Sequence, residues 1–448
     1  MKQILVLGAG RSTTCLVSYF LERAEEQNWF VTVVDKAPQA ARRLVGNHPR
    51  GDAIAFDVND GAMRSTLIEK ADVVVNMLAP AYQYLIASDC VRHGKHMVSA
   101  SYQDIHLSNL NLDAHRKGIL ILTEVGLDPG LDHMSAMSII QEVKNRGGTV
   151  TSFRSYGSAL PAPEAAVNPL RYCITWNPRN VAMAGEHGAQ FLEDGKTKIL
   201  PFHQVFQRTW SVELEGIGEF EAYTSGDSLR YQKLFGLEQV GTMIRGTLRY
   251  PGWSETWLQI VRLGLPNETL RIVSSSKLAY GDLIEMFLPA QSSGANLEQR
   301  VANYLNISPT GRIMENLRWL GLFSSEPISA EVVTAAEALI HLLVKKLQLP
   351  PNGRDMAAIV QDFEASYRQG ENHREKIRST LVEFGDPNGF TAMANTVGLS
   401  IGIVTKILLS KQLPITGCQI PIHPAIYGPV LSELNTLGIR FKKEVSAY

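Results

Sequence analysis

The stretch MKQILVLGAGRSTTC, residues 1–15, decides the fold of this chain. Its apolar run QILVLG predicts a buried strand, and the residues from about Ser12 to Gln27 predict a helix. The next apolar run, FVTVVD, predicts a second strand that ends at Asp35. A strand, a helix and a strand in this order form one βαβ unit, in which the two strands lie parallel.

The same alternation of strands and helices continues along the N-terminal part of the chain. Four more apolar runs of strand length follow, with helical stretches between them: AIAFDV (53–58), ADVVVNML (71–78), HMVSAS (96–101) and ILILTE (119–124). Continuous apolar strands indicate a sheet that is covered on both faces. We therefore predict an α/β fold with a Rossmann-like, doubly wound parallel sheet.

The pattern changes after residue 150. Three segments predict extended strands: TVTSFRSYGSAL (149–160), GTLRYPGW (246–253) and WLQIVRLGL (257–265). Helical patterns then dominate, and strand patterns return in MAAIVQDFEAS (356–366) and IRSTLVEFG (377–385). We predict a Rossmann domain over residues 1–130, onto which residues from about 400 to 448 pack back, a second α/β domain with a mixed sheet over 131–276 and about 350–399, and a small all-helical insert over 277–349.

Composition narrows the class of partner. The 448 residues are too many for one core, and 43 basic against 44 acidic residues leave a net charge of -1. This balance of charges gives no sign of a large basic surface for binding nucleic acid or an anionic membrane, so a small-molecule partner is favoured. The four cysteines have no CxxC spacing and indicate neither a disulfide framework nor a thiolate metal site. We expect a cytoplasmic protein, and a homodimer as the commonest oligomer.

Two apolar segments resemble membrane elements. The opening residues have only the short apolar core ILVLGAG, followed at once by an arginine, so a buried strand is favoured over a signal peptide. The segment TVGLSIGIVTKILL (396–409) contains Lys406 and is shorter than the about 20 residues that a bilayer requires. We therefore expect no membrane insertion.

The turn GAGRST, residues 8–13, matches most of the G-x-G-x-x-G fingerprint of dinucleotide-binding folds, although Thr13 replaces the third glycine. It follows a strand and opens a helix, as the fingerprint requires. Gly8 would permit the tight turn, and Gly10 would let the backbone approach a pyrophosphate at the helix N-terminus. The alternative is a glycine turn that holds no ligand. We predict cofactor contacts from Gly8, Ala9, Gly10, Arg11, Ser12 and Thr13.

Asp35 indicates which dinucleotide binds. A carboxylate at the end of the second strand can accept hydrogen bonds from both ribose hydroxyls and would repel a 2′-phosphate, which favours NAD. Asp35 could also be a plain helix N-cap. The cations that follow it could neutralise a phosphate, so NADP is possible: Lys36, Arg42 and Arg43. Asp57 and Leu78, at the ends of the third and fourth strands, would line the cofactor crevice or be ordinary residues of the sheet edge.

The stretch EVGLDPGLDHM, residues 124–134, gathers acidic residues and a histidine around two glycines and a proline. No partner motif accompanies it, so it is poor evidence for a metal site, and we predict none. Pro129 and Gly130 would make a turn after the last predicted strand, and Asp132 would cap a helix that begins near His133. Asp128 would then project at the carboxyl edge of the sheet, where ligands of such folds bind.

Four further stretches accompany this one: SASYQD (99–104), LPAPEAAVNPLRYCITWNPRN (160–180), IRGTLRYPGW (244–253) and GDPNGFTAMANTVG (385–398). With them the chain resembles, up to about residue 430, the L-glutamate-forming saccharopine dehydrogenases, or saccharopine reductases, of lysine metabolism. The resemblance implies oxidation of saccharopine by NAD or NADP at the carbon bonded to its secondary amine, or the reverse. Water then splits the imine into glutamate and 2-aminoadipate 6-semialdehyde. It also implies that the second α/β domain carries much of the substrate pocket, and we assign dimerisation to that domain.

The resemblance also assigns residues. It implies cofactor contacts at Thr13, Asp35, Gln39, Leu78, Ala100 and Ser101, and substrate contacts at Ser101, Tyr102, Asp128, Thr247, Leu248 and Arg249. Tyr102 and Asp128 are the predicted catalytic residues. The substrate's amine needs an acceptor, which Asp128 can be, and its three carboxylates need donors such as the guanidinium of Arg249. Further donors of this kind are Arg245, Arg179 and Arg171.

Each assignment has an alternative. Arg249 could lie on a solvated strand face, and Tyr102 could simply cap a loop, because its ordinary pKa of about 10 would need lowering for proton transfer. Tyr172 and Trp176 could exclude water from the site or belong to a core. Two rival proton carriers are Glu124 and His133.

Two glycines depart from the family's pattern. Gly226, in YTSGDS (223–228), stands where the family typically has an arginine that binds a substrate carboxylate, and Gly157 stands where it often has a cysteine. A lost guanidinium could cost about 1.5 to 3 kcal/mol of binding unless another cation, such as Arg230, replaces it. A related secondary-amine dehydrogenase, such as a carboxynorspermidine dehydrogenase, is therefore an alternative. An alternative of another class is a catalytically inactive dinucleotide-sensing protein.

Overall fold

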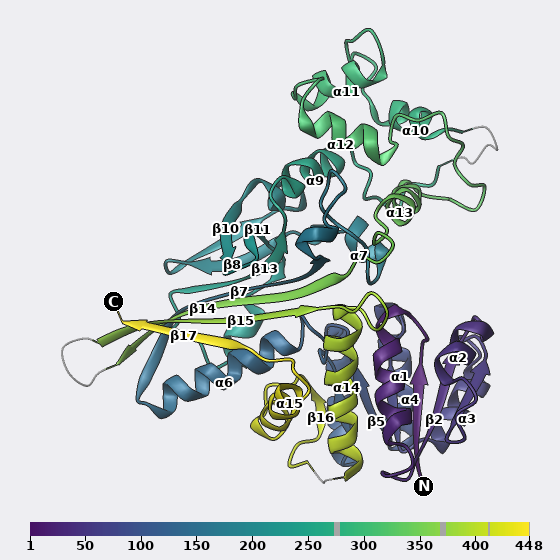
Figure 1. Cartoon of the computed structure of the whole chain (residues 1–448), viewed down its shortest axis with the longest axis vertical. Coiled ribbons are helices and arrows are strands. Elements are labelled where there is room, and N and C mark those ends of the chain that lie inside the picture. The colour runs from purple at the N-terminus through teal and green to yellow at the C-terminus, as the bar shows by residue number, and fades with distance from the viewer. Residues whose placement is uncertain (273–277, 368–372, 411–412, 448) are drawn as a thin grey trace. The chain divides into compact units, whose positions relative to one another are not determined.

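The computed structural model describes residues 1–272, 278–367, 373–410 and 413–447, and Figure 1 shows their course. They form two compact units. Unit 1 comprises Met1–Val150, Gly157–Ala159 and the chain from Met356 onward. Unit 2 comprises Thr151–Tyr156 and Leu160–Asp355.

This division differs from the predicted domains. Residues from Met356 onward belong to unit 1, although residues 350–399 are predicted in the second domain. The predicted helical insert belongs to unit 2, and its predicted boundary at residue 277 lies outside the described residues. A strand's own sequence does not say against which element it packs, so the pattern of residues 356–384 could not assign it to a unit. The functional division into cofactor, substrate and helical domains stays a prediction.

Unit 1 is built on a seven-stranded sheet whose strands all run parallel. The six predicted strands are confirmed, and a seventh, β16, joins the edge beside β6. The strand order is β16-β6-β5-β4-β1-β2-β3, so the order of addition reverses at β1, the place where such sheets open a ligand crevice. The strands are β1 (Lys2–Leu7), β2 (Trp29–Asp35), β3 (Gly51–Ala55), β4 (Val73–Asn76), β5 (His96–Ser99), β6 (Leu120–Leu122) and β16 (Gly417–Gln419).

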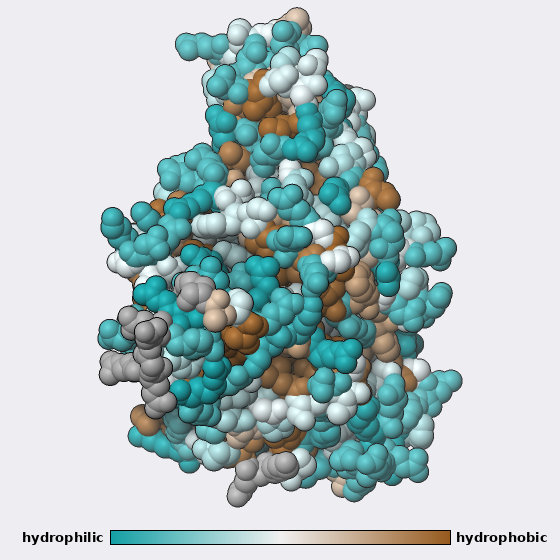
Figure 2. Space-filling model, turned by 60° about the vertical axis from the view of Figure 1, so that its left-hand side comes forward, coloured by the Kyte–Doolittle hydropathy of each residue, from teal (hydrophilic) through white to brown (hydrophobic). Residues whose placement is uncertain are grey.

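Helices cover this sheet because alternate strand residues face a hydrophobic core. Leu5, Val74 and Ile121 of the strands share one buried cluster with Ile68 and Ile86 of the helices. On the face of the molecule shown in Figure 2, hydrophilic side chains cover most of the surface, and hydrophobic side chains lie in small groups. The helices of unit 1 are α1 (Thr14–Arg23), α2 (Pro38–Val45), α3 (Gly61–Lys70), α4 (Gln83–His93), α5 (Asn111–Arg116), α6 (Leu131–Asn145), α14 (Ala392–Ser410) and α15 (Pro424–Thr436), with short 3-10 turns η1 (Arg11–Thr13), η2 (Pro80–Tyr82) and η3 (Ile105–Leu110).

Helix α14 stands beside α1 (Figure 1). A Cβ at Gly398 would lie 2.7 Å from the backbone nitrogen of Leu16, and one at Gly402 would lie 2.6 Å from the ring of Tyr19. These glycines, one turn apart, therefore let the two helices approach closely. By length and composition α14 could cross a membrane, but 72% of its most apolar window is buried inside the structure, as in a core helix.

Long antiparallel strands complete unit 1. The predicted strands near residues 356–385 are confirmed as β14 (Asp355–Tyr367) and β15 (His373–Phe384), which pair with each other. β15 also pairs with β17 (Lys442–Ala447), whose residues are all exposed. The strand predicted at 149–160 is β7 (Gly148–Pro161), and it contributes residues to both units.

Unit 2 contains a sheet of mixed strand directions, as predicted. β11 pairs antiparallel with β10 and β13, and β8 pairs antiparallel with β13 and β9 but parallel with β12. Its strands are β8 (Ala189–Glu193), β9 (Lys196–Leu200), β10 (Thr209–Leu214), β11 (Gly218–Thr224), β12 (Gly226–Asp227) and β13 (Thr242–Arg249). Its helices are α7 (Pro178–Ala182), α8 (Arg230–Leu234), α9 (Trp253–Arg262), α10 (Tyr280–Phe287), α11 (Leu297–Leu305), α12 (Arg312–Leu320) and α13 (Ala335–Lys346), with 3-10 turns η4 (Pro163–Ala165) and η5 (Phe202–Gln207).

One predicted strand is wrong. Residues 257–265 are predicted as a strand, whereas most of them belong to helix α9, Trp253–Arg262. Its buried residues Trp253, Trp257 and Ile260 are spaced three or four apart and so lie on one face of a helix. Gly252, with a left-handed φ of 96°, separates this helix from β13. The apolar run was long enough for either structure, and packing of the two tryptophans decided between them.

Candidate active site

The glycine turn after β1 has the geometry of a dinucleotide cradle. Gly8 has a left-handed φ of 103°, and a Cβ there would lie 3.0 Å from the carbonyl oxygen of Met77, just after β4. Gly8 is therefore required where the loops after β1 and β4 meet. A Cβ at Gly10 would meet nothing within 4 Å, so this side of the turn is open to a ligand. Thr13, in place of the third glycine, is buried, and its N–H donates to the Gly10 carbonyl (3.0 Å).

Asp35 braces this turn. Its Oδ2 accepts the N–H of Ala9 at 2.7 Å, and its Oδ1 accepts the N–H of Ala37 at 2.8 Å. The alternative of a plain N-cap is wrong, because the N-cap of α2 is Ala37. A carboxylate offers about four acceptor positions, so two remain for ribose hydroxyls.

The other predicted cofactor residues follow the carboxyl ends of neighbouring strands. Gln39 lies exposed in the first turn of α2, and Leu78 is half-buried after β4. Asp57 is exposed after β3, and the N–H of Asn59 together with the charge of Lys36 lowers its pKa. Ala100 and Ser101 follow β5. Because carboxyl ends of parallel strands share one edge, the fold brings all of these residues to that edge. The cations Lys36, Arg42 and Arg43 are exposed.

The loop of residues 126–130 is a tight knot at the same edge. Gly126 donates to the carbonyl of Pro129 at 2.9 Å, and Gly130 has a left-handed φ of 147°. A Cβ at Gly130 would lie 2.2 Å from backbone atoms of Gly126, so only glycine fits. The predicted turn at Pro129 and Gly130 is thus confirmed. The predicted cap is wrong: the helix begins at Leu131, and Asp132 lies within its first turn.

The knot brings the two predicted catalytic residues together. The hydroxyl of Tyr102 donates to Oδ1 of Asp128 at 3.4 Å, which is long for a bond between two oxygens. Tyr102 is 49% exposed and Asp128 is partly buried, so both can meet a ligand. A Cβ at Gly157 would lie 2.6 Å from Oδ2 of Asp128, so the absence of a side chain at Gly157 makes room for this carboxylate. A phenol beside a carboxylate can hold and move a proton.

Glu124 and His133, the rival proton carriers, are both fully buried. Nε2 of His133 lies 2.8 Å from Oε2 of Glu124. They are therefore more deeply buried than the exposed Tyr102 and the partly buried Asp128. Sequence reasoning could not find their pairing, since nothing in the spacing of residues 124 and 133 predicts burial.

In unit 2, Arg249 lies in an aromatic cage. It is 3% exposed, so the alternative of a solvated strand face is wrong. Its guanidinium carbon lies 4.6 Å from the ring centre of Trp253, 4.7 Å from that of Tyr172 and 5.7 Å from that of Tyr223. Burial raises the pKa of both tyrosines, and the charge of Arg249 offsets part of that rise. The rings therefore hold the guanidinium through cation–π contacts.

Sequence reasoning missed Tyr223 and Trp253 as members of this cage. Both residues lie in stretches that were compared with the family's pattern: Trp253 ends IRGTLRYPGW, and Tyr223 begins YTSGDS. Trp176, predicted to shield the site, donates its indole N–H to the Tyr172 hydroxyl at 3.3 Å. Tyr172 itself is a buried wall of the cage.

The remaining predicted residues of unit 2 have different surroundings. Arg245 is 5% exposed, with its guanidinium 4.3 Å from the ring centre of Tyr231. The Leu248 carbonyl accepts from Nη1 of Arg249 at 2.8 Å, and the Thr247 hydroxyl donates to that of Ser225 at 3.4 Å.

Arg179 and Arg171 are both exposed. Arg179 forms a two-pronged ion pair with Glu268, whose side chain raises its pKa, so a substrate carboxylate would compete with Glu268. Arg171 lies 4.1 Å from the ring centre of Tyr250. The structure therefore supports Arg249 and Arg245 as built-in cations more strongly than Arg179.

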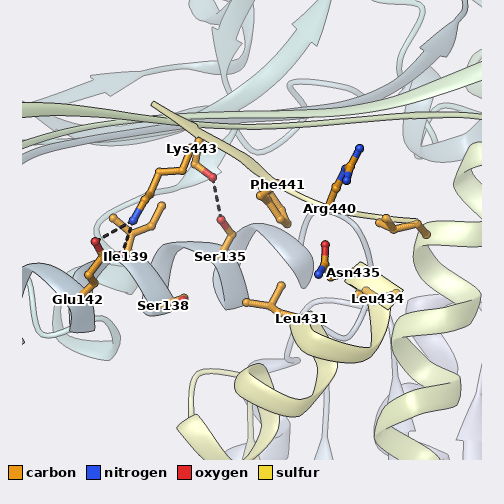
Figure 3. A pocket seen from close by; sticks show the side chains of 12 residues that line it. Ser135, Ser138, Ile139, Glu142, Leu431, Leu434, Asn435, Arg440, Phe441 and Lys443 are labelled. Carbon is orange, nitrogen blue, oxygen red and sulfur yellow. Dashed lines mark hydrogen bonds and ion pairs between the residues drawn. The ribbon is translucent and has the colours of Figure 1, made fainter. Parts of the chain in front are cut away.

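Two hollows of the surface have described linings. One in unit 1, of about 250 Å³, lies between α6, α15 and strands β15 and β17 (Figure 3) and contains none of the predicted site residues. Ser135 and Ser379, whose hydroxyl oxygens lie 3.2 Å apart, are among its lining residues, and the Lys443–Glu142 ion pair lies at one side of it. Another, of about 410 Å³ in unit 2, includes Arg171. Over the part of the chain that the structure describes, no group of three or more His, Cys, Asp or Glu side chains could hold a metal.

A parallel sheet with a glycine cradle, a Tyr–Asp pair at its carboxyl edge and a second unit with caged arginines define the chain as a dinucleotide-dependent oxidoreductase. Comparison with known proteins narrows the class. The model of the saccharopine dehydrogenase NADP binding domain matches residues 4–122, and that of the saccharopine dehydrogenase C-terminal domain matches residues 126–439. The chain therefore belongs to the saccharopine dehydrogenase family, and the resemblance seen in its sequence is confirmed.

Relatives match along the whole chain. The saccharopine dehydrogenase [NADP(+), L-glutamate-forming] of Schizosaccharomyces pombe is 31% identical over 99% of both chains, and that of Saccharomyces cerevisiae is 30% identical over 100% of both. The mitochondrial alpha-aminoadipic semialdehyde synthase of Mus musculus is 30% identical over 99% of this chain and 48% of its own. The solved structure of apo saccharopine dehydrogenase (L-Glu forming) from S. cerevisiae matches 100% of both chains, with a TM-score of 0.86 and 28% identity.

These matches confirm a nicotinamide dinucleotide as cofactor. They revise the predicted preference, because the matching domain and the fungal relatives are named for NADP, whereas Asp35 led us to favour NAD. The residues at the end of β2 are compatible with either dinucleotide. Backbone N–H groups bind the Asp35 carboxylate, and three exposed cations follow it in the chain: Lys36, Arg42 and Arg43.

Proposed function

We propose that this chain is an NAD(P)-dependent, L-glutamate-forming saccharopine dehydrogenase of lysine metabolism, which oxidises saccharopine at its secondary amine or catalyses the reverse. The observation that carries the proposal is the Tyr102–Asp128 pair at the carboxyl edge of a dinucleotide-binding sheet. It occurs in a chain that matches, over its full length, relatives named for this reaction.

The bound dinucleotide would supply the hydride acceptor. Asp128 would accept the proton of the secondary amine, and Tyr102 would donate a hydrogen bond that orients this carboxylate. Loss of a hydride from carbon and a proton from nitrogen leaves a carbon–nitrogen double bond in the substrate. Water adds its hydroxyl to that carbon and a proton to the nitrogen, the carbon–nitrogen bond breaks as the hydroxyl proton passes to the nitrogen and the carbonyl forms, and Asp128 returns a proton to the departing amine, which yields glutamate and the aldehyde.

Substrate recognition would fall to the caged arginines of unit 2. A guanidinium fixed against three rings loses little freedom when it binds a carboxylate, so Arg249 is prepared for one of the three acids of saccharopine. Arg245, held against Tyr231, would serve a second. These assignments and those of Ser101, Thr247 and Leu248 stay predictions.

The test is turnover by the purified full chain. Saccharopine with NADP⁺ or NAD⁺ should produce the reduced cofactor, glutamate and an aldehyde that a hydrazine traps, in equal amounts. Absence of turnover with both dinucleotides, in protein that melts cooperatively, would refute the proposal. The same result with tight dinucleotide binding would favour the dinucleotide-sensing protein.

We also propose that NADP is preferred. The names of the relatives and the exposed Lys36, Arg42 and Arg43 support this, because these cations can neutralise a 2′-phosphate. Comparison of kcat/KM for the two dinucleotides tests it, and a higher value with NAD would contradict it.

A second candidate function is oxidation of another secondary amine, favoured by Gly226. This residue is exposed, and a Cβ there would meet nothing within 4 Å, so a substrate with a different group at this position would find space. Reductive condensation of a panel of amines with oxo acids and aldehydes tests this candidate. A higher kcat/KM with an amine other than glutamate would favour it.

We further propose a cytoplasmic homodimer. The exposed strand β17 pairs with β15 along one edge, and an exposed edge strand is a template for pairing with another chain. Light scattering should give twice the chain mass of 49.5 kDa, and a single-chain mass would refute the dimer. Cell fractionation tests the compartment.

A further inference from the structure

Three buried ionisable side chains lie beneath the candidate active site in unit 1. Glu124, Asp132 and His133 are 0%, 2% and 0% exposed. His133 stands between the two acids, with Nε2 2.8 Å from Oε2 of Glu124 and Nδ1 3.2 Å from Oδ2 of Asp132. Buried charges are costly unless they are paired, and here the imidazole lies within contact distance of both carboxylates.

Each acid also holds one loop of the site. Oε1 of Glu124 accepts the N–H of Gln103 at 2.9 Å, in the loop that carries Tyr102. Oδ1 of Asp132 accepts the N–H of Gly130 at 2.6 Å, in the knot that carries Asp128. A continuous row of contacts thus runs from the residue after Tyr102, through the buried acids and histidine, to within two residues of Asp128.

Other contacts fix the two ends of this row. The N–H of Glu124 donates to the carbonyl of Ser101 at 3.0 Å, and Glu124 has a left-handed φ of 60°. Few non-glycine residues adopt this conformation, and they do so where their surroundings impose it. The amide of Gln361 on β14 donates to the carbonyl of Asp132 at 2.7 Å, which anchors the start of α6.

We propose that Glu124, His133 and Asp132 form a brace that sets the position of Tyr102 relative to Asp128, and that they are positioning residues for the reaction. This inference rests on the proposed function. The contact of Tyr102 with Asp128 is long, and the buried acids bind the backbone of both loops that carry these residues, so the positions of the loops contribute to their separation. The brace reaches the Tyr102 loop through a backbone N–H, which does not relay a proton, and this argues for positioning over proton transfer.

Paired substitutions of Glu124 separate these two roles. Glu124→Gln keeps an acceptor for Gln103 and a donor for His133 but removes the charge, whereas Glu124→Ala removes both contacts. For positioning, Glu124→Ala lowers kcat for saccharopine by about tenfold or more with KM for the dinucleotide nearly unchanged, and Glu124→Gln stays within about threefold of wild type. Equal losses in both variants, or wild-type kcat in folded Glu124→Ala, would overturn the proposal.

His133 provides a second pair if Glu124→Ala does not fold. The amide nitrogen of glutamine can occupy the place of Nε2, so His133→Gln keeps the contact with Glu124, whereas the shorter asparagine loses it. The brace predicts a lower kcat for His133→Asn than for His133→Gln. The reverse order, or no difference, would overturn the proposal.

The matched control is another buried ion pair of unit 1. Nε of Arg64 lies 2.7 Å from Oδ2 of Asp89, with side chains 8% and 2% exposed, between α3 and α4. Asp89→Asn should lower the melting temperature and leave kcat of the folded enzyme unchanged. A fall in kcat equal to that of Glu124→Ala would mean general destabilisation and overturn the proposal. Lack of turnover in the wild type would instead refute the proposed function, so the two failures are distinguishable.

Discussion

Gly157 provides the sharpest test of the geometry around Asp128. A Cβ at this position of β7 would lie 2.6 Å from Oδ2 of Asp128, 2.9 Å from its Cβ and 3.2 Å from its Cγ. Rotation of the carboxylate would relieve only the first contact. Because the Asp128 Cβ is fixed to the backbone of a tight knot, Gly157→Ala must displace the whole side chain.

The size of the effect follows from these distances. Two carbon atoms in contact need about 3.5 Å or more, so the Asp128 side chain must retreat by roughly half an ångström. A displacement of about 1 Å in an active site can cost 10²-fold in rate, so we expect kcat to fall by about ten- to a hundredfold. That loss corresponds to about 1.4 to 2.7 kcal/mol of activation free energy.

The assay is steady-state oxidation of saccharopine by Gly157→Ala, with the dissociation constant of the dinucleotide measured alongside. The dinucleotide constant should be unchanged, since the atoms nearest to a Cβ at Gly157 belong to Asp128 and not to the glycine turn of residues 8–13. Gly241→Ala is the matched control, because a Cβ there would lie an ordinary 3.5 Å from the carbonyl oxygen of Thr151. Wild-type kcat in Gly157→Ala would refute the placement of Asp128.

Three further predictions concern single residues. Asp128→Asn should lower kcat by about 10²- to 10⁴-fold, as expected for loss of an acid–base group, and leave dinucleotide affinity nearly unchanged; an equal loss of affinity, measured by titration, would contradict its position. Asp35→Asn should raise the ratio of kcat/KM for NADP to that for NAD, because it removes a charge that repels a 2′-phosphate; a lower ratio would contradict this. Hydrogen bonding from Arg146 lowers the pKa of Glu375 to about 2, so this carboxylate stabilises the fold fully above its ordinary pKa of 4.5 and loses that effect as pH falls toward 2. Arg146→Met should move the midpoint of acid unfolding to higher pH, and an unchanged midpoint would show that the pair contributes little.

The sequence by itself determined the dinucleotide-binding half of this protein. Apolar strands, a glycine turn and a helix following at once are local patterns, and each residue's role depends on its neighbours in the chain. Gly8 is a clear case, because its left-handed backbone and the edge of β4 leave no room for a side chain. The position of Asp128 at the carboxyl edge also followed from local order, since a turn after a parallel strand can lie nowhere else.

Only the tertiary structure decided which side chains meet. Arg249 finds its cage among rings that come from β11, α9 and the loop before α7, and Arg179 finds Glu268, 89 residues along the chain. The brace of Glu124, His133 and Asp132 depends on complete burial, which periodicity does not report. Helix α9 is a similar case. Its apolar run is compatible with a strand or a helix, and the packing of Trp253 and Trp257 selects the helix. Local sequence determines backbone conformation, whereas the partners of a charged or aromatic side chain depend on packing between segments far apart in the chain.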